Sequence, residues 1–276
     1  MHRTVSTRLS LACACLAAAW LWQPMASALD SGASDVRAIL RQALDRQAGT
    51  RSLGRVRMQI RDRTGTRERM LTMRSKRYDD ARKTLILIEQ PADVRNTGFL
   101  SIDYRAGGRT DEQWLYLPKL HRVTRVPNSG KADPFVGSDF SIADLSPQDP
   151  ERFDARLVEP EVKLGDEACW LIEVTPRDAA ARAESGYEKM QIWVSKHKGM
   201  TLQLKGWLPN GARTKYFKVS DVKQVNGVWT AHRMQMRTLE GNDVASETVI
   251  DVLQVDNDAA DVSDADFTQQ RLERGV

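Results

Sequence analysis

A period-two alternation of apolar and polar residues runs through most of this 276-residue sequence and constrains its fold most strongly. Because successive side chains of a strand point to opposite faces, this period predicts strands with one apolar face. Short turn sequences, such as Asn210-Gly211 and Asn226-Gly227, separate the segments and favour tight hairpins. Consecutive strands joined by tight turns indicate an antiparallel meander. We expect strands at residues 55–61, 67–76, 84–89, 99–104, 114–117, 121–126, 153–158, 169–175, 187–195, 201–207, 214–222, 229–238 and 246–255.

Two of these segments, Thr84–Glu89 and Trp114–Leu117, are apolar at both odd and even positions. A strand with one face in water would be apolar at alternate positions only. We therefore expect both segments to be covered on both sides of the sheet. Pro118 follows the second segment and ends it, because proline cannot donate a ladder hydrogen bond.

One amphipathic helix is predicted at Asp35–Ala48, where apolar residues recur at helical spacing from Val36 to Leu44. A long meander must close or cover its edges, and the helix stripe needs an apolar surface. The predicted fold class is mainly β (α+β): a single antiparallel incomplete β-barrel, with an N-terminal helix and short helices as a lid. The spacing of Ser141 and Asp144 matches a capping box and predicts a short helix that begins near residues 138–141.

The first 28 residues have the features of a cleaved secretory signal. Arg3 and Arg8 precede the apolar segment Leu9–Trp22, and Ala26-Ser27-Ala28 is a small-residue cleavage site. The competing interpretation is a transmembrane anchor, for which the apolar segment is short. We expect a periplasmic protein with one domain at residues 29–276, acting as a monomer.

Cysteine usage predicts no disulfide in that domain. Cys13 and Cys15 lie inside the leader without the spacing of a lipoprotein signal, so Cys169 is the only cysteine that remains. One cysteine cannot form an internal disulfide. Its apolar neighbours favour a buried core residue over a reactive thiol.

Charge is distributed unevenly along the chain. The segment Arg51–Lys83 is strongly basic, and the tail after Glu240 is acidic. Two interpretations remain open for the basic segment: it meets anionic head groups or an acidic partner, or it is the solvated face of a sheet. The chain contains no nucleic-acid-binding module, so we expect no nucleic-acid partner.

The sequence contains no convincing catalytic or metal-binding constellation. His121, His197 and His232 lack metal-ligand spacing with one another or with a cysteine, and no phosphate-binding glycine loop occurs. Ser138-Asp139 resembles a nucleophile region, but a helix cap explains both residues more simply. We expect no catalytic residues, no metal, no cofactor and no enzyme activity.

Several motifs resemble those of the outer-membrane lipoprotein-sorting protein family, which is similar to the periplasmic lipoprotein carrier LolA. They are Thr97–Leu100 (TGFL), Gln113–Pro118 (QWLYLP), the spaced Arg122 and Arg125, and Gly137–Leu145 (GSDFSIADL), which departs from the family pattern at Ile142-Ala143. The resemblance implies an incomplete barrel with a helical lid. It also implies a carrier of lipid or acylated protein cargo, working with an RND-type inner-membrane transporter.

Candidate ligand-binding residues come from methionines and aromatic residues on the predicted strands, because methionine suits surfaces that accommodate variable apolar shapes. Ordinary core packing is the competing interpretation for each of them. Two arginines could hold a phosphate or carboxylate head group at the cavity mouth, or could be paired within the sheet. The ten candidates are Met58, Met73, Ile86, Phe99, Trp114, Tyr116, Arg122, Arg125, Phe140 and Trp193.

Two functional hypotheses follow from these observations. The first is a periplasmic carrier that binds a lipid or lipidated protein in an apolar cavity and shuttles it between an inner-membrane exporter and the outer membrane, with transient membrane contact. The second is a periplasmic binding or sensing module that regulates a protein partner and transports nothing.

Overall fold

The computed structural model describes residues 36–43, 49–104, 109–146, 149–209 and 211–276. The predicted leader, residues 1–28, lies outside the described residues. In the described part of the chain, no helix combines the length and the apolar character that crossing a membrane requires.

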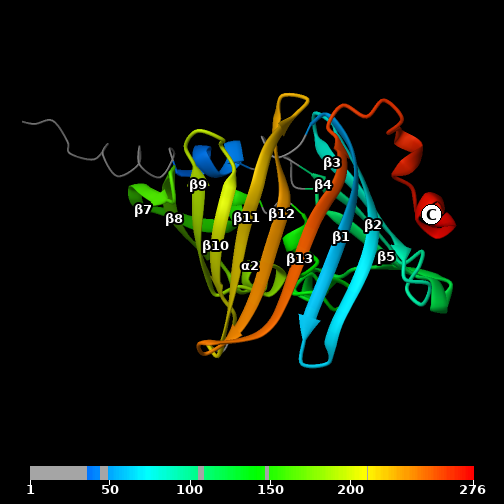
Figure 1. Cartoon of the computed structure of the whole chain (residues 1–276), viewed down its shortest axis with the longest axis horizontal. Coiled ribbons are helices and arrows are strands. Elements are labelled where there is room, and N and C mark those ends of the chain that lie inside the picture. The colour runs from blue at the N-terminus through cyan, green and yellow to red at the C-terminus, as the bar shows by residue number, and fades with distance from the viewer. Residues whose placement is uncertain (1–35, 44–48, 105–108, 147–148, 210) are drawn as a thin grey trace, which may run out of the picture.

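Thirteen strands form one antiparallel sheet in the order β6-β5-β4-β3-β2-β1-β13-β12-β11-β10-β9-β8-β7 (Figure 1). All neighbours are consecutive in the sequence except β1 and β13, which pair and join the two halves of the meander. The bounds are β1 Arg51–Asp62, β2 Gly65–Arg77, β3 Ala81–Gln90, β4 Gly98–Tyr104, β5 Glu112–Leu117, β6 Arg122–Arg125, β7 Phe153–Leu164, β8 Glu167–Pro176, β9 Lys189–Ser195, β10 Thr201–Trp207, β11 Arg213–Val225, β12 Val228–Glu240 and β13 Asp243–Asp256.

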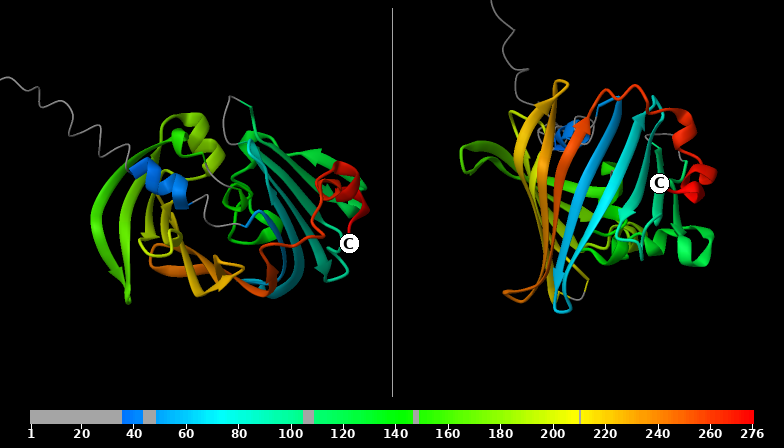
Figure 2. Two further views of the ribbon diagram at one scale, coloured as in Figure 1. Left: turned by 90° about the horizontal axis from the view of Figure 1, so that it is seen from above. Right: turned by 45° about the vertical axis from the view of Figure 1, so that its right-hand side comes forward.

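The sheet curves around a concave side but does not close (Figure 2). Its two edges are β6 and β7, which do not pair with each other in the part of the chain that the structure describes. The predicted antiparallel, mainly β fold with an unclosed sheet is therefore confirmed. The long edge strand β7 contains Pro160 and two register irregularities, which limit its pairing with other chains.

Short helices occupy the concave side and the ends of the sheet. Residues 36–43 are helical, which matches part of the predicted N-terminal helix; residues 44–48 lie outside the described residues. Helix α2 (Ala179–Ser185) connects β8 and β9, begins at the capping carboxylate of Asp178 and ends at Gly186, where φ is 75°. The remaining short elements are η1 Pro118–Leu120, η2 Asn128–Gly130, η3 Phe135–Gly137, η4 Ala143–Leu145, η5 Pro150–Arg152, η6 Asp264–Asp266 and α3 Gln269–Arg274.

The C-terminal segment covers the convex face of β3, β4 and β5 (Figure 1). This acidic end of the chain is folded: Phe267 is buried, and the segment forms η6 and α3, which the sequence pattern did not reveal. Leu272 of α3 is fully buried there. The two segments predicted to be covered on both sides of the sheet, Thr84–Glu89 and Trp114–Leu117, thus have one face in this cluster and the other on the concave side, as predicted. The cluster on this face contains Leu85, Leu87, Leu100, Tyr116, Ala259, Val262, Phe267 and Leu272.

The basic segment Arg51–Lys83 is largely neutralised by carboxylates from neighbouring strands and from the acidic tail. Arg57 lies 3.0 Å from Asp251, and Lys76 lies 2.6 Å from Asp264. Further pairs join Arg55 to Glu89, Arg63 to Glu240 and Arg74 to Asp266. These pairs favour the interpretation of this segment as a solvated sheet face, because few of its cations are left for an external anion.

Candidate functional site

The concave face of the sheet is apolar over β1 to β4 and β11 to β13. Cross-strand neighbours such as Val56 and Leu71, or Ile86 and Phe99, share this face. Their side chains are removed from water, which stabilises the fold in proportion to the apolar area buried. The buried members of this first cluster are Val56, Met58, Ile60, Leu71, Ile86, Ile88, Phe99, Phe135, Phe140, Ile142, Met236 and Ile250.

Residues 126–146, which we call the plug, lie against this apolar face. The plug contains three short 3-10 turns and folds back on itself, since Phe135 N donates to Phe140 O (2.8 Å) and Ala143 N donates to Lys131 O (2.7 Å). This fold places Phe135, Phe140 and Ile142 in the first cluster. Phe135 meets Phe99 edge-on, with ring centroids 5.9 Å apart. The plug therefore takes the place of a second layer over the sheet.

The predicted capping box forms within the plug. Ser141 N donates to Asp144 Oδ2 (2.8 Å), and Asp144 N donates to Ser141 Oγ (3.2 Å). The turn that it starts is the single 3-10 turn η4, which begins at Ala143.

Asp139 attaches the plug to the sheet through its buried carboxylate. Thr238 Oγ1 donates to Asp139 Oδ1 (2.6 Å), Thr248 Oγ1 donates to Oδ2 (2.7 Å), and the hydroxyl of Ser246 also donates to Oδ1. The backbone N–H of Asp139 donates to Thr248 Oγ1 (2.9 Å). The interpretation of Asp139 as a helix cap is therefore wrong: it bonds to β12 and β13, about a hundred residues away. We call this group the Asp139 anchor.

A second polar contact joins the plug to the other half of the sheet. Tyr187 Oη donates to Asp144 Oδ1 (2.9 Å), and Lys215 Nζ lies 3.3 Å from Asp144 Oδ2. Burial raises the pKa of Tyr187 well above its ordinary value, and the neighbouring carboxylate of Asp144 adds to the effect. Tyr187 therefore stays protonated and keeps donating this hydrogen bond.

A buried arginine lies directly beneath the plug. Arg69 of β2 is the cross-strand neighbour of Met58, and its Nη2 donates to the carbonyl oxygen of Val136 (3.1 Å). Its Nε has no hydrogen-bond partner among the described residues. Burial lowers the pKa of Arg69, and the nearby charge of Arg67 lowers it further. Val136 has a φ of 45°, which is costly for a β-branched residue.

The end of the plug meets a buried polar cluster on β4 and β5. Ser101 Oγ donates to Asp103 Oδ1 (2.7 Å), and Gln113 Nε2 donates to Ser146 Oγ (2.9 Å). Asp103 Oδ2 and Gln113 Oε1 have no partners among the described residues. Burial raises the pKa of Asp103 to about 6. Burial favours the protonated form of Asp103, which predominates below about pH 6.

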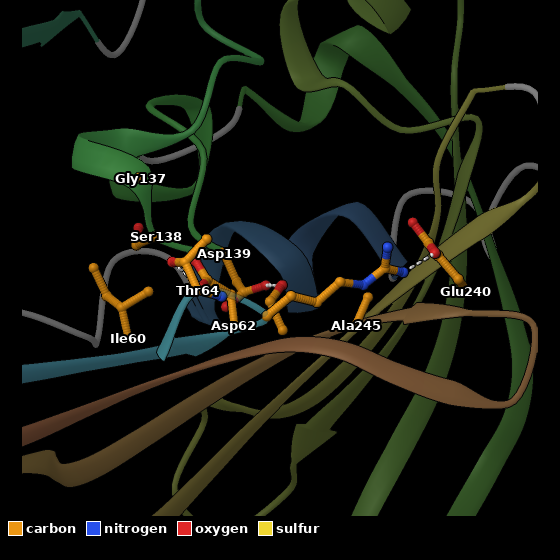
Figure 3. Close-up of a pocket in the computed structure, with 10 residues that line it drawn as sticks. Ile60, Asp62, Thr64, Gly137, Ser138, Asp139, Glu240 and Ala245 are labelled. Carbon is orange, nitrogen blue, oxygen red and sulfur yellow. Dashed lines mark hydrogen bonds and ion pairs between the residues drawn. The ribbon is translucent and has the colours of Figure 1, made fainter. Parts of the chain in front are cut away.

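A pocket of about 270 Å³ lies between the plug and the hairpins β1–β2 and β12–β13 (Figure 3). Its charged residues are mostly engaged with one another: Arg63 pairs with Glu240 at 2.8 Å, and Asp62 accepts a hydrogen bond from Thr64 N. This volume is slightly below the ~300–1,000 Å³ of typical small-molecule sites. The lining does not suit an acyl chain. It consists of Ile60, Asp62, Arg63, Thr64, Gly137, Ser138, Asp139, Glu240, Ala245 and Ser246.

Five of the ten candidate binding residues come together on the concave side. Met58, Ile86, Phe99 and Phe140 are buried in the first cluster, and Met73 packs against it. The plug covers this group, so these residues are core in this conformation. Whether they also bind a ligand stays a prediction.

The other five candidates lie elsewhere. Trp114 and Tyr116 belong to the convex cluster, since the C-terminal segment covers that face of β5. Trp193 is the cross-strand neighbour of Leu171 and Gln203. It lies on the opposite face of β9 from Ile192, which packs on the concave side. Arg122 and Arg125 are exposed on the edge strand β6. Alternation assigned these residues to faces but could not say which face was concave.

A second apolar cluster on the concave side was not among the candidates. The helical residues 36–43 pack Val36, Leu40 and Ala43 against β7 to β10. The amphipathic stripe indicated that the helix needs such a surface, but no sequence pattern named the strands that provide it. The other buried members are Phe153, Ile172, Val174, Tyr187, Met190 and Val194.

The cysteine and the acidic residues show no catalytic arrangement in the part of the chain that the structure describes. Cys169 is buried, and burial raises the pKa of its thiol to about 11, which matches the predicted core role. Within the described ranges, no group of three or more His, Cys, Asp or Glu side chains is arranged to hold a metal ion.

Known proteins with similar sequences and folds were compared with this chain. A family model with the description "Uncharacterized protein" matches residues 80–274. A domain from Vibrio parahaemolyticus, described as an outer membrane lipoprotein-sorting protein, has a TM-score of 0.77 and 27% identity, covering 88% of this chain and 100% of that one. A DUF1329 family protein from Desulfovibrio piger ATCC 29098 has a TM-score of 0.77 and 25% identity, covering 87% and 99%.

A LolA superfamily protein from Nitrosomonas europaea shares the fold, with a TM-score of 0.63 and 17% identity over 86% of this chain and 98% of that chain. No curated protein matches the sequence. The resemblance found in the sequence motifs is thus confirmed by the fold and by the family model.

Proposed function

This chain belongs to the protein family whose model spans residues 80–274, with the fold of outer membrane lipoprotein-sorting and LolA superfamily proteins, and we propose that it is a periplasmic carrier. Its cargo is a lipid or a lipidated protein, which it takes from an RND-type inner-membrane transporter and delivers toward the outer membrane. The function requires binding and release, not catalysis.

The observation that carries this proposal is the apolar concave face covered by a plug instead of a second sheet. An acyl chain in water costs ~0.8 kcal/mol per CH₂, so a 16-carbon chain costs roughly 10 kcal/mol or more. A sheet face that presents Met58, Ile86 and Phe99 can remove that cost if the plug moves aside. The 270 Å³ pocket is lined mostly by polar and charged residues, so it does not serve this purpose.

The plug has the features of a movable cover. Its turns are short, and beside the apolar contacts of Phe135, Phe140 and Ile142 it is held by separate polar contacts: the Asp139 anchor, the contacts of Asp144, and the hydrogen bond from Arg69. If the plug leaves, Arg69 loses its acceptor on Val136 and faces the concave side with an unpaired charge. An anionic head group would then satisfy the guanidinium, which suits phosphate and carboxylate geometry.

A disulfide between the plug and α2 tests the proposal. A Cβ built on Gly186 lies 2.9 Å from the Cβ of Ala132, so Gly186→Cys with Ala132→Cys needs only a small shift to reach disulfide geometry. Position 186 has a φ of 75°, so the single variant Gly186→Cys controls for backbone strain. The remaining cysteine, Cys169, is buried and does not compete.

The measurement is native mass spectrometry of the purified mature protein after incubation with phospholipid or with an acylated peptide. We expect the wild type and the reduced double variant to take up cargo and the oxidised double variant to take up none. Equal uptake by the oxidised and reduced forms would contradict a role for plug movement. No uptake by the wild type would contradict the carrier itself.

A second candidate function is a periplasmic module that binds a protein partner and carries no cargo. The observation that favours it is the filled concave side, where Phe135, Phe140 and Ile142 already occupy the apolar surface. Under this function the plug stays in place, and neither form of the double variant takes up lipid. The same experiment therefore separates the two candidates.

A further inference from the structure

The turn between β5 and β6, together with β6, carries cations that nothing in the described chain neutralises. Lys119, Arg122 and Arg125 are exposed, and no ion pair or hydrogen bond of their side chains is found among the described residues. The stretch from residue 113 to residue 132 contains no aspartate or glutamate. This contrasts with the basic segment Arg51–Lys83, where most arginines pair with carboxylates, as Arg55 does with Glu89 and Arg63 with Glu240. We call residues 118–125 the basic tip.

The basic tip also exposes its one large aliphatic side chain at the turn. Leu120 of η1 is 67% exposed, the highest value among the exposed large hydrophobic residues. The tip extends beyond the body of the sheet, as the green segment after β5 shows in Figures 1 and 2. His121 ends η1 with a φ of 46°, which reverses the chain and leaves Leu120 at the apex between cations.

The two arginines flank the edge strand on both faces. By register, Arg122 is opposite Leu117 and Arg125 is opposite Trp114, so one lies on the concave side and the other on the convex side. A flat anionic surface that approaches the edge of the sheet would therefore meet both guanidinium groups. A pocket for one head group would instead need both side chains on the same face.

We propose that the basic tip docks this protein on an anionic phospholipid bilayer, with Leu120 entering the acyl boundary and Lys119, Arg122 and Arg125 contacting head-group phosphates. An apolar side chain flanked by basic residues is the arrangement that binds membrane surfaces. The charge of the tip is complementary to anionic lipid, and the tip is the exposed, unpaired edge of the fold. Docking does not depend on cargo, so it goes beyond the carrier function and would hold without it.

Vesicle flotation of the mature protein tests the proposal. The probes are vesicles of equal parts phosphatidylglycerol and phosphatidylcholine, and vesicles of phosphatidylcholine alone. Each basic residue near an anionic surface contributes about fivefold in partition, so Arg122→Gln with Arg125→Gln should lower binding to the anionic vesicles about 25-fold. Leu120→Ser should lower binding about tenfold, and higher salt should lower the binding of the wild type.

The control variant removes the same charge from arginines that are paired. Arg55→Gln with Arg63→Gln lowers the net charge equally, but both residues face carboxylates, Glu89 and Glu240. We expect this variant to bind anionic vesicles like the wild type. Equal losses in the two double variants would mean that net charge alone governs binding and would overturn the proposal.

Two further outcomes would also overturn it. The first is no flotation of the wild type with anionic vesicles at low salt, which would assign the tip to an acidic protein surface instead. The second is equal flotation with neutral and anionic vesicles. Cargo uptake is measured separately by mass spectrometry, so a failed docking test and a failed carrier test are distinguishable.

Discussion

The Asp139 anchor makes a quantitative prediction about the plug. In Asp139→Ala, the hydroxyls of Thr238, Ser246 and Thr248 lose their common acceptor at a site where Asp139 is only 6% exposed. Taking about 1 kcal/mol net for each hydrogen bond, the plug loses about 3 kcal/mol of stability relative to its open state. That free energy corresponds to a rise of roughly a hundredfold in the open population.

Hydrogen exchange followed by mass spectrometry measures this population directly. The amides of Phe135 and Ala143 bond within the plug and are buried while it is closed. Opening exposes them to water, so they should exchange roughly a hundredfold faster in the variant. Amides at the centre of the pairing between β1 and β2 should be unchanged, because they are protected by the sheet itself. Asp133→Ala is the matched control: Asp133 is also in the plug, but its side chain is exposed.

A double-mutant cycle tests whether the carboxylate acts through its hydroxyl partners. Thr238→Val keeps the shape of the side chain and removes one hydroxyl donor to the Asp139 carboxylate, so it should cost about 1 kcal/mol in the wild type. In Asp139→Ala the same change should cost almost nothing, which gives a coupling of about 1 kcal/mol. The reasoning is refuted if the coupling is near zero, or if Asp139→Ala and Asp133→Ala give the same exchange in the plug.

Two more predictions concern buried groups outside the anchor. The raised pKa of Asp103, about 6 against an ordinary 3.8, means that the folded state binds its proton more tightly than the unfolded state. This contribution to stability is complete below about pH 4 and is lost as the pH rises through 6. It amounts to at most about 3 kcal/mol, at 1.36 kcal/mol per pKa unit. Asp103→Asn should therefore flatten the fall in stability between pH 4 and pH 7 in urea denaturation; an unchanged pH profile would contradict the burial argument. Gly206→Ala should destabilise by about 1–3 kcal/mol through overpacking, because the new methyl group would overlap the ring of the fully buried Tyr187. The control Gly54→Ala has 3.5 Å to its nearest atom and should be near neutral by the same measurement.

The candidate site was predictable only in part. Alternation placed Met58, Ile86 and Phe99 on apolar strand faces, and the structure brings them together under the plug. The same alternation could not separate them from Trp114 and Tyr116, because β5 is apolar on both faces and each face is covered by a different segment. The hydrogen bond from Arg69 to Val136 could not be predicted from the sequence. The one hint was that Arg69 shares a strand face with the apolar Leu71 and Met73.

The antiparallel pairing of consecutive strands within each half of the sheet was determined by the sequence alone. The pairing of β1 with β13 and the open edges at β6 and β7 were not. Period-two segments and tight turns leave a meander as the simplest arrangement, and the doubly apolar segments showed which strands are covered on both sides. These are local properties, since a strand's faces and a turn's φ angles depend on neighbouring residues.

Only the tertiary structure decided which face is concave and what covers it. The curvature of the sheet brings Asp139 to Thr238 and Thr248, and it brings the C-terminal segment to the outside of β3 to β5. Such contacts join segments that are far apart in the sequence, and many residues could have supplied the same hydroxyl or apolar surface. Alternation predicts that two side chains lie on the same face of a strand. The direction in which the whole sheet curves determines which segments of the chain pack against that face.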